Sequence, residues 1–119
     1  MKIITFSLLL ICSVVSYAGE WIADKKSGCQ VWNENPAANE TINYSGTCSN
    51  GKAHGKGAVQ WLTDGIPISS YDGEFVEGKL TGKGVLFDKN GENYEGNFLD
   101  GKLHGKGIRI TVRGGVKFV

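Results

Sequence analysis

The side chains best suited to chemistry in this sequence occur at repeated positions. His54 and His104 each begin the run His-Gly-Lys-Gly, and a third copy of that run has Thr81 in place of the histidine. An active site needs an acid–base residue once, so a histidine placed twice at one repeat position is better explained by a role in turns or packing. Asp72 and Glu74 share a strand face, but a solvated carboxylate pair explains them better than acid–base catalysis does.

Motifs that mark enzymes and cofactor sites are absent from the sequence. It has no HExxH, CxxC or phosphate-binding loop, and its serines belong to no recognisable nucleophile motif. The run Gly105-Lys106-Gly107 is not a phosphate cradle, because no helix is expected after it. We therefore predict no catalytic residue, no metal site, no cofactor and no enzymatic activity.

Lysine recurs in the same runs as histidine. In each copy one lysine follows a turn glycine, and a second lysine stands between two glycines. Stacked copies would align the second set with the histidines as a stripe that could hold anionic head groups, glycans or an acidic protein surface. The alternative is that nearby carboxylates neutralise the lysines, which leaves a solvated face that opposes aggregation. The candidate binding stripe consists of His54, Lys56, Lys83, His104 and Lys106.

These runs belong to a longer repeat that begins at Tyr44, Tyr71 and Tyr94. The shared pattern is Y-x-G-x-[F/C]-x-x-G-K-x-x-G-K-G. Side chains alternate between the two faces of a strand, so the tyrosine, the first glycine and the aromatic residue of a copy share one face. Glycine weakens a strand unless something approaches its backbone, so we predict that each aromatic ring lies over glycine of an adjacent strand. The predicted structural residues are Tyr44, Gly46, Tyr71, Gly73, Phe75, Tyr94, Gly96 and Phe98.

Turn dipeptides such as Asn50-Gly51 and Asp100-Gly101 separate segments rich in Val, Phe, Tyr, Trp and Thr. These dipeptides favour two-residue hairpins, because both residues can take positive φ. The pattern predicts an all-β fold, a single extended twisted antiparallel meander sheet built from repeated β-hairpins, with about seven or eight short strands. Residues 19–28 show no clear strand pattern, and residues 62–70 are expected to form a longer connecting loop.

Residues 1–18 have the pattern of an export signal. Lys2 supplies a positive charge, residues 3–15 an apolar run, and Ser16-Tyr17-Ala18 a small-x-small cleavage site. We predict a signal peptide cleaved after Ala18 and a periplasmic or secreted location, the alternative being an uncleaved membrane anchor. Without Lys2 the thirteen basic residues become twelve and balance the twelve acidic ones, so no basic excess points to nucleic acid.

Two cysteines would remain after cleavage, Cys29 and Cys48. An even pair in an exported chain is expected to form a disulfide, whereas a two-cysteine metal site lacks a nearby histidine or CxxC partner. Cys48 takes the place of Phe75 and Phe98 in the other copies, so the bond would staple the N-terminal segment across the first hairpin. The predicted division is a signal peptide (1–18), a disulfide-bonded cap (19–43) and a repeat domain (44–119) with repeats 44–66, 71–93 and 94–115 and a partial capping unit at 116–119.

The repeat pattern resembles the MORN repeat over residues 44–107, with a partial unit beyond. Residues 28–33 and 46–48 also resemble the cysteine-stapled start of some exported bacterial MORN proteins, whereas Cys48 and Thr81 depart from the repeat pattern itself. The resemblance implies a twisted sheet with one hairpin per repeat and a scaffold or interaction role, with links to membranes. We expect a non-enzymatic exported module that binds a protein partner through its sheet, and no nucleic acid. The alternative is a peripheral binder of an envelope or membrane surface that uses the Lys/His stripe.

Overall fold

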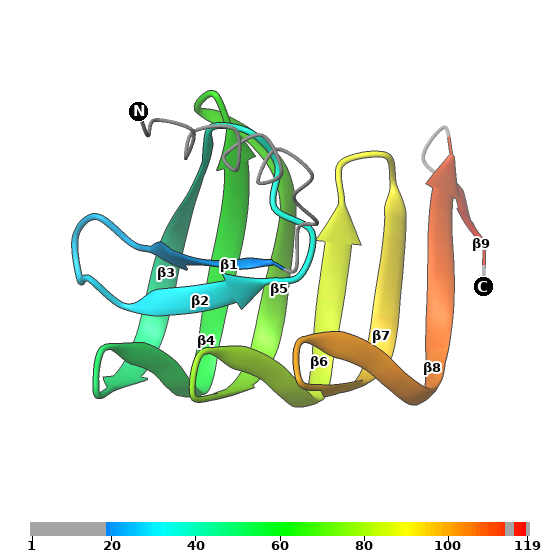
Figure 1. The fold of residues 1–119 in the computed structure, drawn as a ribbon. Coiled ribbons are helices and arrows are strands. Elements are labelled where there is room, and N and C mark those ends of the chain that lie inside the picture. The colour runs from blue at the N-terminus through cyan, green and yellow to red at the C-terminus, as the bar shows by residue number, and fades with distance from the viewer. Residues whose placement is uncertain (1–18, 114–115, 119) are drawn as a thin grey trace, which may run out of the picture.

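The computed structural model describes residues 19–113 and 116–118. The predicted signal peptide, the Gly114-Gly115 turn and Val119 lie outside the described residues. Nine strands form the described part of the chain (Figure 1). They are β1 (Glu20–Ala23), β2 (Gln30–Asn33), β3 (Glu40–Ser49), β4 (Lys52–Thr63), β5 (Ile66–Val76), β6 (Lys79–Asp88), β7 (Glu92–Leu99), β8 (Lys102–Arg113) and β9 (Val116–Phe118).

Strands β3 to β9 lie side by side in chain order as an antiparallel meander, which confirms the predicted fold class. Strands β1 and β2 form a hairpin that crosses in front of β3, β4 and β5 (Figure 1). This crossing hairpin joins the sheet at β4, where Gln30 is the parallel partner of Lys52. The reading of residues 19–28 as patternless was wrong for β1, because this short strand is stabilised by pairing with β2 and by burial of Ile22.

Four hairpin turns have the geometry that their dipeptides predicted. Both residues of each turn have positive φ, for example 51° at Asn50 and 80° at Gly51. Positive φ at both positions matches the turn to the twist of the flanking strands, so two residues suffice to connect them. The four turns are Asn50-Gly51, Asp64-Gly65, Glu77-Gly78 and Asp100-Gly101.

Residues 62–70 do not form the predicted connecting loop. Strands β4 and β5 continue through this segment to the Asp64-Gly65 turn, so the additional residues lengthen one hairpin. Pro67 is the partner of Leu62, next to an irregularity in the register. Pro67 also lies beyond the part of β5 that pairs with β6, so its missing N–H leaves that second ladder intact.

Five aromatic rings form an edge-to-face ladder along the core. Neighbouring ring centroids are between 4.9 and 5.9 Å apart, and the interplanar angles lie between 78° and 88°. Their order across the sheet is Tyr44, Phe75, Tyr71, Phe98 and Tyr94. Tyr71 is fully buried at the centre, whereas Tyr94 at the C-terminal end is only partly buried.

The tyrosine rings lie over glycine as predicted, but the phenylalanine rings do not. A Cβ added to the last glycine of each repeat would collide with the hydroxyl end of a tyrosine. The pairs are Tyr44 with Gly57, Tyr71 with Gly84, and Tyr94 with Gly107. Phe75 and Phe98 instead pack between tyrosines. The glycines paired with them, Gly55 and Gly82, have φ of 86° and 59° and allow the backbone to turn.

The Tyr71 hydroxyl forms hydrogen bonds at an irregularity in the pairing between β5 and β6. In the middle repeat the register passes from Gly73–Gly84 to Glu74–Thr81, which leaves two residues of β6 without partners on β5. The Tyr71 hydroxyl lies 3.1 Å from Glu74 O and 3.2 Å from Thr81 O, and it accepts a hydrogen bond from Glu74 N at 3.2 Å. Burial is the main reason why the pKa of Tyr71 is raised to about 12. Phenylalanine at this position would remove the hydrogen bonds that the hydroxyl makes with this irregular stretch of backbone.

Candidate functional site

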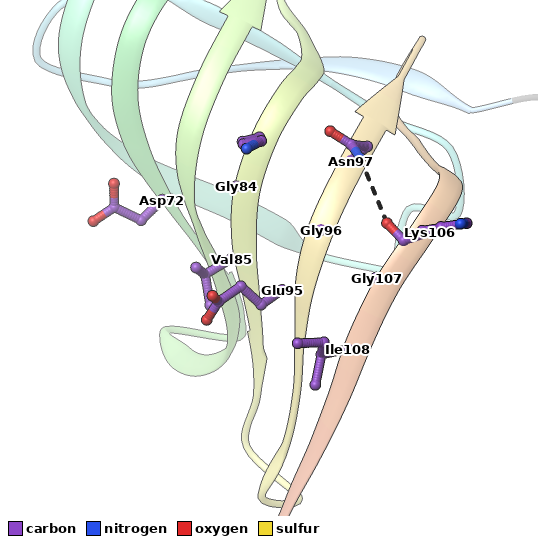
Figure 2. A pocket seen from close by; sticks show the side chains of 10 residues that line it. Asp72, Gly84, Val85, Glu95, Gly96, Asn97, Lys106, Gly107 and Ile108 are labelled. Carbon is purple, nitrogen blue, oxygen red and sulfur yellow. Dashed lines mark hydrogen bonds between the residues drawn. The ribbon is translucent and has the colours of Figure 1, made fainter. Parts of the chain in front are cut away.

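The face of the sheet opposite the aromatic core carries a groove over β5 to β8 (Figure 2). Its volume is about 620 Å³. Its floor includes Gly84, Gly96 and Gly107, which are partners across β6, β7 and β8. The Cβ direction of these glycines points to the core face, where the tyrosine rings lie, so the outer floor is bare backbone.

Side chains of different character line the two sides of this floor. On the side nearer the hairpin turns, Lys83 is opposite Asn97, and Asn97 Nδ2 donates a hydrogen bond to Lys106 O at 3.5 Å. The other side alternates carboxylate and apolar residues, which are partners across four strands. They are, in order, Asp72, Val85, Glu95 and Ile108. A molecule in the groove would therefore meet ammonium groups on one side and carboxylates on the other.

The groove contains two of the three stripe lysines. Lys83 and Lys106 line it, whereas Lys56 is exposed opposite Glu74 on β5 and does not. Lysines of this row occupy alternate strands, so neighbouring members are about 10 Å apart. None of them takes part in an ion pair found among residues 19–113 and 116–118. Whether nearby carboxylates neutralise these lysines on a solvated face therefore stays a prediction.

The stripe histidines lie outside the groove. Both His54 and His104 are exposed, in the segments that follow their hairpin turns. The Nδ1 atom of His54 accepts a hydrogen bond from the backbone N–H of Glu77 at 3.2 Å, which links the first repeat to the turn of the next. This contact fits the predicted structural role, and binding by the whole stripe remains a prediction.

The lysines that follow the turn glycines contact the crossing hairpin and the loop after it. The contacts are Lys52 Nζ over the Trp21 ring at 4.2 Å, Lys79 Nζ over the Trp32 ring at 5.4 Å, and Lys102 Nζ to Glu34 Oε2 at 3.5 Å. Strand β2 also donates hydrogen bonds to the turns, from Gln30 N to Gly51 O (2.9 Å) and from Trp32 N to Gly78 O (2.8 Å). The crossing hairpin thus holds successive turns in line, a role that sequence reasoning missed.

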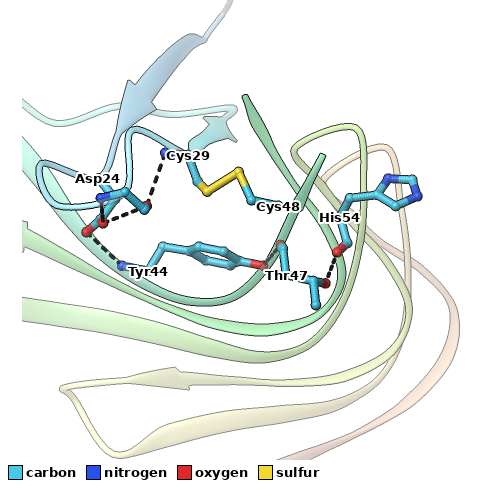
Figure 3. The surroundings of a disulfide bond; sticks show 7 residues. Asp24, Cys29, Tyr44, Thr47, Cys48 and His54 are labelled. Atoms are coloured by element: carbon cyan, nitrogen blue, oxygen red, sulfur yellow. Dashed lines mark hydrogen bonds between the residues drawn. A yellow bond between two sulfur atoms is a disulfide. The ribbon is translucent and has the colours of Figure 1, made fainter. Parts of the chain in front are cut away.

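The predicted disulfide between Cys29 and Cys48 is present, with an S–S distance of 2.07 Å (Figure 3). It joins the crossing hairpin to β3, whose aromatic position is occupied by Cys48. Cys29 is buried beside the core, next to Val31 and Ile22 of the same hairpin. The bond therefore attaches the hairpin at the one repeat that lacks a phenylalanine.

Asp24 provides a second attachment at the same end of the sheet. Among the residues that the structure describes, Asp24 is the one charged residue that is buried, with an exposed fraction of 5%. Its carboxylate accepts hydrogen bonds from Ser27 N (2.9 Å), Ser27 Oγ (2.8 Å) and the backbone N–H of Tyr44 (3.1 Å) (Figure 3). Burial acts to raise the pKa of Asp24 and is the largest single influence, but these hydrogen bonds together hold the pKa below its usual value.

Comparison with known proteins identifies the repeat. A family model for the MORN repeat matches residues 17–29, 44–61, 71–92 and 94–116, more than half of the chain. The chain therefore belongs to the MORN repeat family. MORN repeats are non-catalytic modules that commonly bind proteins or membranes. No curated protein matches the chain.

The match at residues 17–29 was not anticipated from the sequence. Tyr17, Gly19 and Trp21 have the Y-x-G-x-aromatic spacing of the later repeats, but no G-K-x-x-G-K-G segment follows them. In the structure Trp21 pairs with Trp32 edge to face, with centroids 5.2 Å apart. In the part of the chain that the structure describes, no helix has the length and apolar character needed to cross a membrane, and no metal-ligand cluster is found.

Proposed function

We propose that this chain is an exported, non-enzymatic scaffold that binds a segment of a partner protein in the outer-face groove. The family supports an interaction role, and the sequence of residues 1–18 supports export. The groove crosses four strands, or about 14 Å, a distance that about four or five extended residues would span. Its volume falls within the range of ligand-binding clefts.

The observation that carries this proposal is the opposition of charge across the groove. Lys83 and Lys106 stand on one side, and Asp72 and Glu95 stand on the other, where they alternate with Val85 and Ile108. A polypeptide segment can present acidic, basic and apolar groups together, so it can match both sides. An anionic membrane surface would be attracted by the lysines but repelled by the carboxylates.

The second candidate is a peripheral binder of an anionic envelope or membrane surface. It is favoured by the exposure of Lys56, Lys83 and Lys106 on one row, with His54 and His104 nearer the turns. A flat anionic surface would contact the full row, whereas a peptide in the groove would contact only two of its lysines.

Charge reversal on each side of the groove separates the two candidates. One variant is Lys83→Glu with Lys106→Glu, and the other is Asp72→Lys with Glu95→Lys. A matched control reverses exposed charges at turns, Lys89→Glu with Asp64→Lys. Each purified chain is used as bait for proteins of its native envelope extract, and each is tested for sedimentation with vesicles of anionic phospholipid.

The peptide-binding proposal predicts that both groove variants lose the captured partner and that the control retains it. Membrane binding predicts that the two groove variants change vesicle binding in opposite directions. The lysine variant loses vesicle binding, and the carboxylate variant binds vesicles more strongly. Retention of the partner by both groove variants would exclude the groove as its site. The export part of the proposal predicts a mature N-terminus at Gly19 in the secreted or periplasmic fraction, measured by N-terminal sequencing.

A further inference from the structure

Successive repeats are joined by backbone hydrogen bonds from one hairpin turn to the strand after the previous turn. Gly78 N donates to Ala53 O at 2.7 Å, and Gly101 N donates to Leu80 O at 3.1 Å. Ala53 and Leu80 occupy the same repeat position, two residues after the turn glycine. Each repeat thus provides an acceptor that fixes the turn of the next one.

The last repeat provides the same acceptor at an open edge. Leu103 is the counterpart of Ala53 and Leu80, and His104 is the counterpart of His54. Strand β9 pairs only with residues 111–113 of β8, so no described strand pairs with the far side of the Lys102–Arg109 segment. Every residue of that segment is exposed, including the apolar side chains of Leu103 (46%) and Ile108 (49%).

The opposite end of the sheet has the matching edge. Residues 45–51 of β3 and its turn are all exposed, and the only described strand beside this part of β3 is β4. The N–H of Tyr44 points away from β4, toward Asp24. Backbone groups of alternate residues face the same side of a strand, so those of Gly46 and Cys48 also face outward. They are the counterparts of the β7 residues Gly96 and Phe98, which pair with β6.

We propose that copies of this chain associate head to tail, with the outer edge of β3 of one copy on the outer edge of β8 of the next. The pairing between β6 and β7 inside the chain fixes the register: Gly82 with Phe98, Gly84 with Gly96, and Val85 with Glu95. The intermolecular pairs are Gly105 with Cys48, Gly107 with Gly46, and Ile108 with Ser45. Gly51 N of the incoming turn would donate to Leu103 O.

A second copy fits this edge because it carries the turn that the internal junctions use. The φ values of Asn50 and Gly51 are 51° and 80°, nearly equal to the 52° and 82° of Asp100 and Gly101. The incoming edge residues Ser45, Thr47 and Ser49 are small and uncharged, so they bring no like charge against the lysines of β8. The contact continues an interface that already joins the repeats. It is heterologous, so it adds further copies in a row rather than closing a dimer.

Site-specific disulfide trapping tests this register. Ser45→Cys and Ile108→Cys are made in separate mature chains (residues 19–119), which lack Cys12, and these are purified, mixed and oxidised mildly. Directly opposed residues have Cβ atoms close enough to bridge. Because a head-to-tail contact never places either position opposite itself, the cross-linked dimer should form in the mixture and not in either chain alone. The control mixture replaces Ile108→Cys with Glu74→Cys, an exposed position away from the edges.

Sedimentation velocity of the unmodified chain gives a second readout. The proposal predicts that raising the protein concentration shifts the distribution from monomer toward dimer and larger species. It also predicts that Ile108→Lys, which places a charge on the edge, removes the shift. A monomer at all concentrations, or equal cross-linking in the test and control mixtures, would overturn the proposal. Asp72→Lys with Glu95→Lys should leave the shift unchanged, so this outcome is independent of whether the groove binds a partner.

Discussion

The two ends of the repeat stack are finished in different ways. At the N-terminal end, the Cys29–Cys48 disulfide and the Asp24 carboxylate fasten a crossing hairpin to β3. At the C-terminal end, β9 covers only three residues of β8. The apolar side chains of Leu103 and Ile108, elsewhere on β8, remain exposed. A repeat sheet needs some protection at each end, because an open strand edge invites further pairing. The difference suggests that the crossing hairpin fixes the N-terminal end for stability, while the edge of β3 at residues 45–51 and the edge of β8 at residues 102–109 both stay open for assembly.

Loss of the disulfide should have the largest effect on stability. Replacing both Cys29 and Cys48 with alanine removes a cross-link between positions 19 residues apart and frees the crossing hairpin. A closed loop of that length contributes about 3 kcal/mol, which corresponds to a fall in Tm of roughly 10–20 °C. Calorimetry of the oxidised chain and the variant measures the difference. A Tm within a few degrees of the wild-type value would show that the staple is not what holds the N-terminal end.

Valine in place of a glycine that lies under a tyrosine ring should lower the free energy of unfolding more in the middle of the stack than at its end. At Gly84 the new side chain would displace the fully buried Tyr71, and overpacking of this kind lowers the free energy of unfolding by about 2–3 kcal/mol. At Gly107 it would displace the partly buried Tyr94, which can move toward solvent, so about 1 kcal/mol is expected. Urea titration of both variants measures the two free energies of unfolding. Equal decreases would contradict the claim that the core is packed more tightly in the middle of the stack than at its end.

Substitution of Asp24 should reduce stability in a pH-dependent way. Asp24→Asn keeps the shape but leaves donors of Ser27 and Tyr44 poorly matched, a loss of about 1–2 kcal/mol at neutral pH. The folded pKa of Asp24 lies below its unfolded value, so its contribution is complete above about pH 4 and is lost as pH falls through the folded pKa. The stability gap between wild type and variant should therefore close in acid. A gap that stays constant down to low pH would contradict this role.

Removal of the Tyr71 hydroxyl should have a smaller effect, visible also at high pH. Tyr71→Phe removes the hydrogen bonds between the hydroxyl and the partly buried backbone groups of Glu74 and Thr81, which costs about 1 kcal/mol. The folded pKa of Tyr71 is raised to about 12, so its contribution is complete below about pH 10 and is lost between about pH 10 and 12. The wild-type Tm should thus fall more steeply than the variant Tm in that range. Parallel curves would show that the hydroxyl is not the titrating group.

The repeat region could be predicted because the sequence features that determine its hairpins and core face are local. Turn dipeptides such as Asn50-Gly51 set the hairpins, and a tyrosine two residues before a glycine sets the core face. The same rules failed at residues 62–70, since nothing local distinguishes a longer hairpin from a loop that contains Pro67. They also failed for β1, whose strand state depends on pairing with β2 and on burial against the sheet rather than on its own pattern.

The candidate site was only half predicted. Lys83 and Lys106 were recognised because lysine recurs at one repeat position. Asp72 and Glu95 were not recognised as part of the site, because their place across the groove depends on register irregularities that the sequence does not reveal. The lysines at positions 52, 79 and 102 recur just as regularly, yet they contact the crossing hairpin or the loop after it. Recurrence therefore marks a shared geometry, and only the fold distinguishes a binding residue from a structural one.

Amide hydrogen exchange measured residue by residue tests the contrast between the two ends most directly. The contrast predicts that the inner strands β4 and β5 exchange only through global unfolding, because the crossing hairpin, the disulfide and Asp24 must all be released together. It predicts that the Lys102–Arg109 segment of β8 exchanges much faster, through local opening, in dilute solution where copies do not associate. Equal protection of β4 and of the Lys102–Arg109 segment in dilute solution would contradict this contrast.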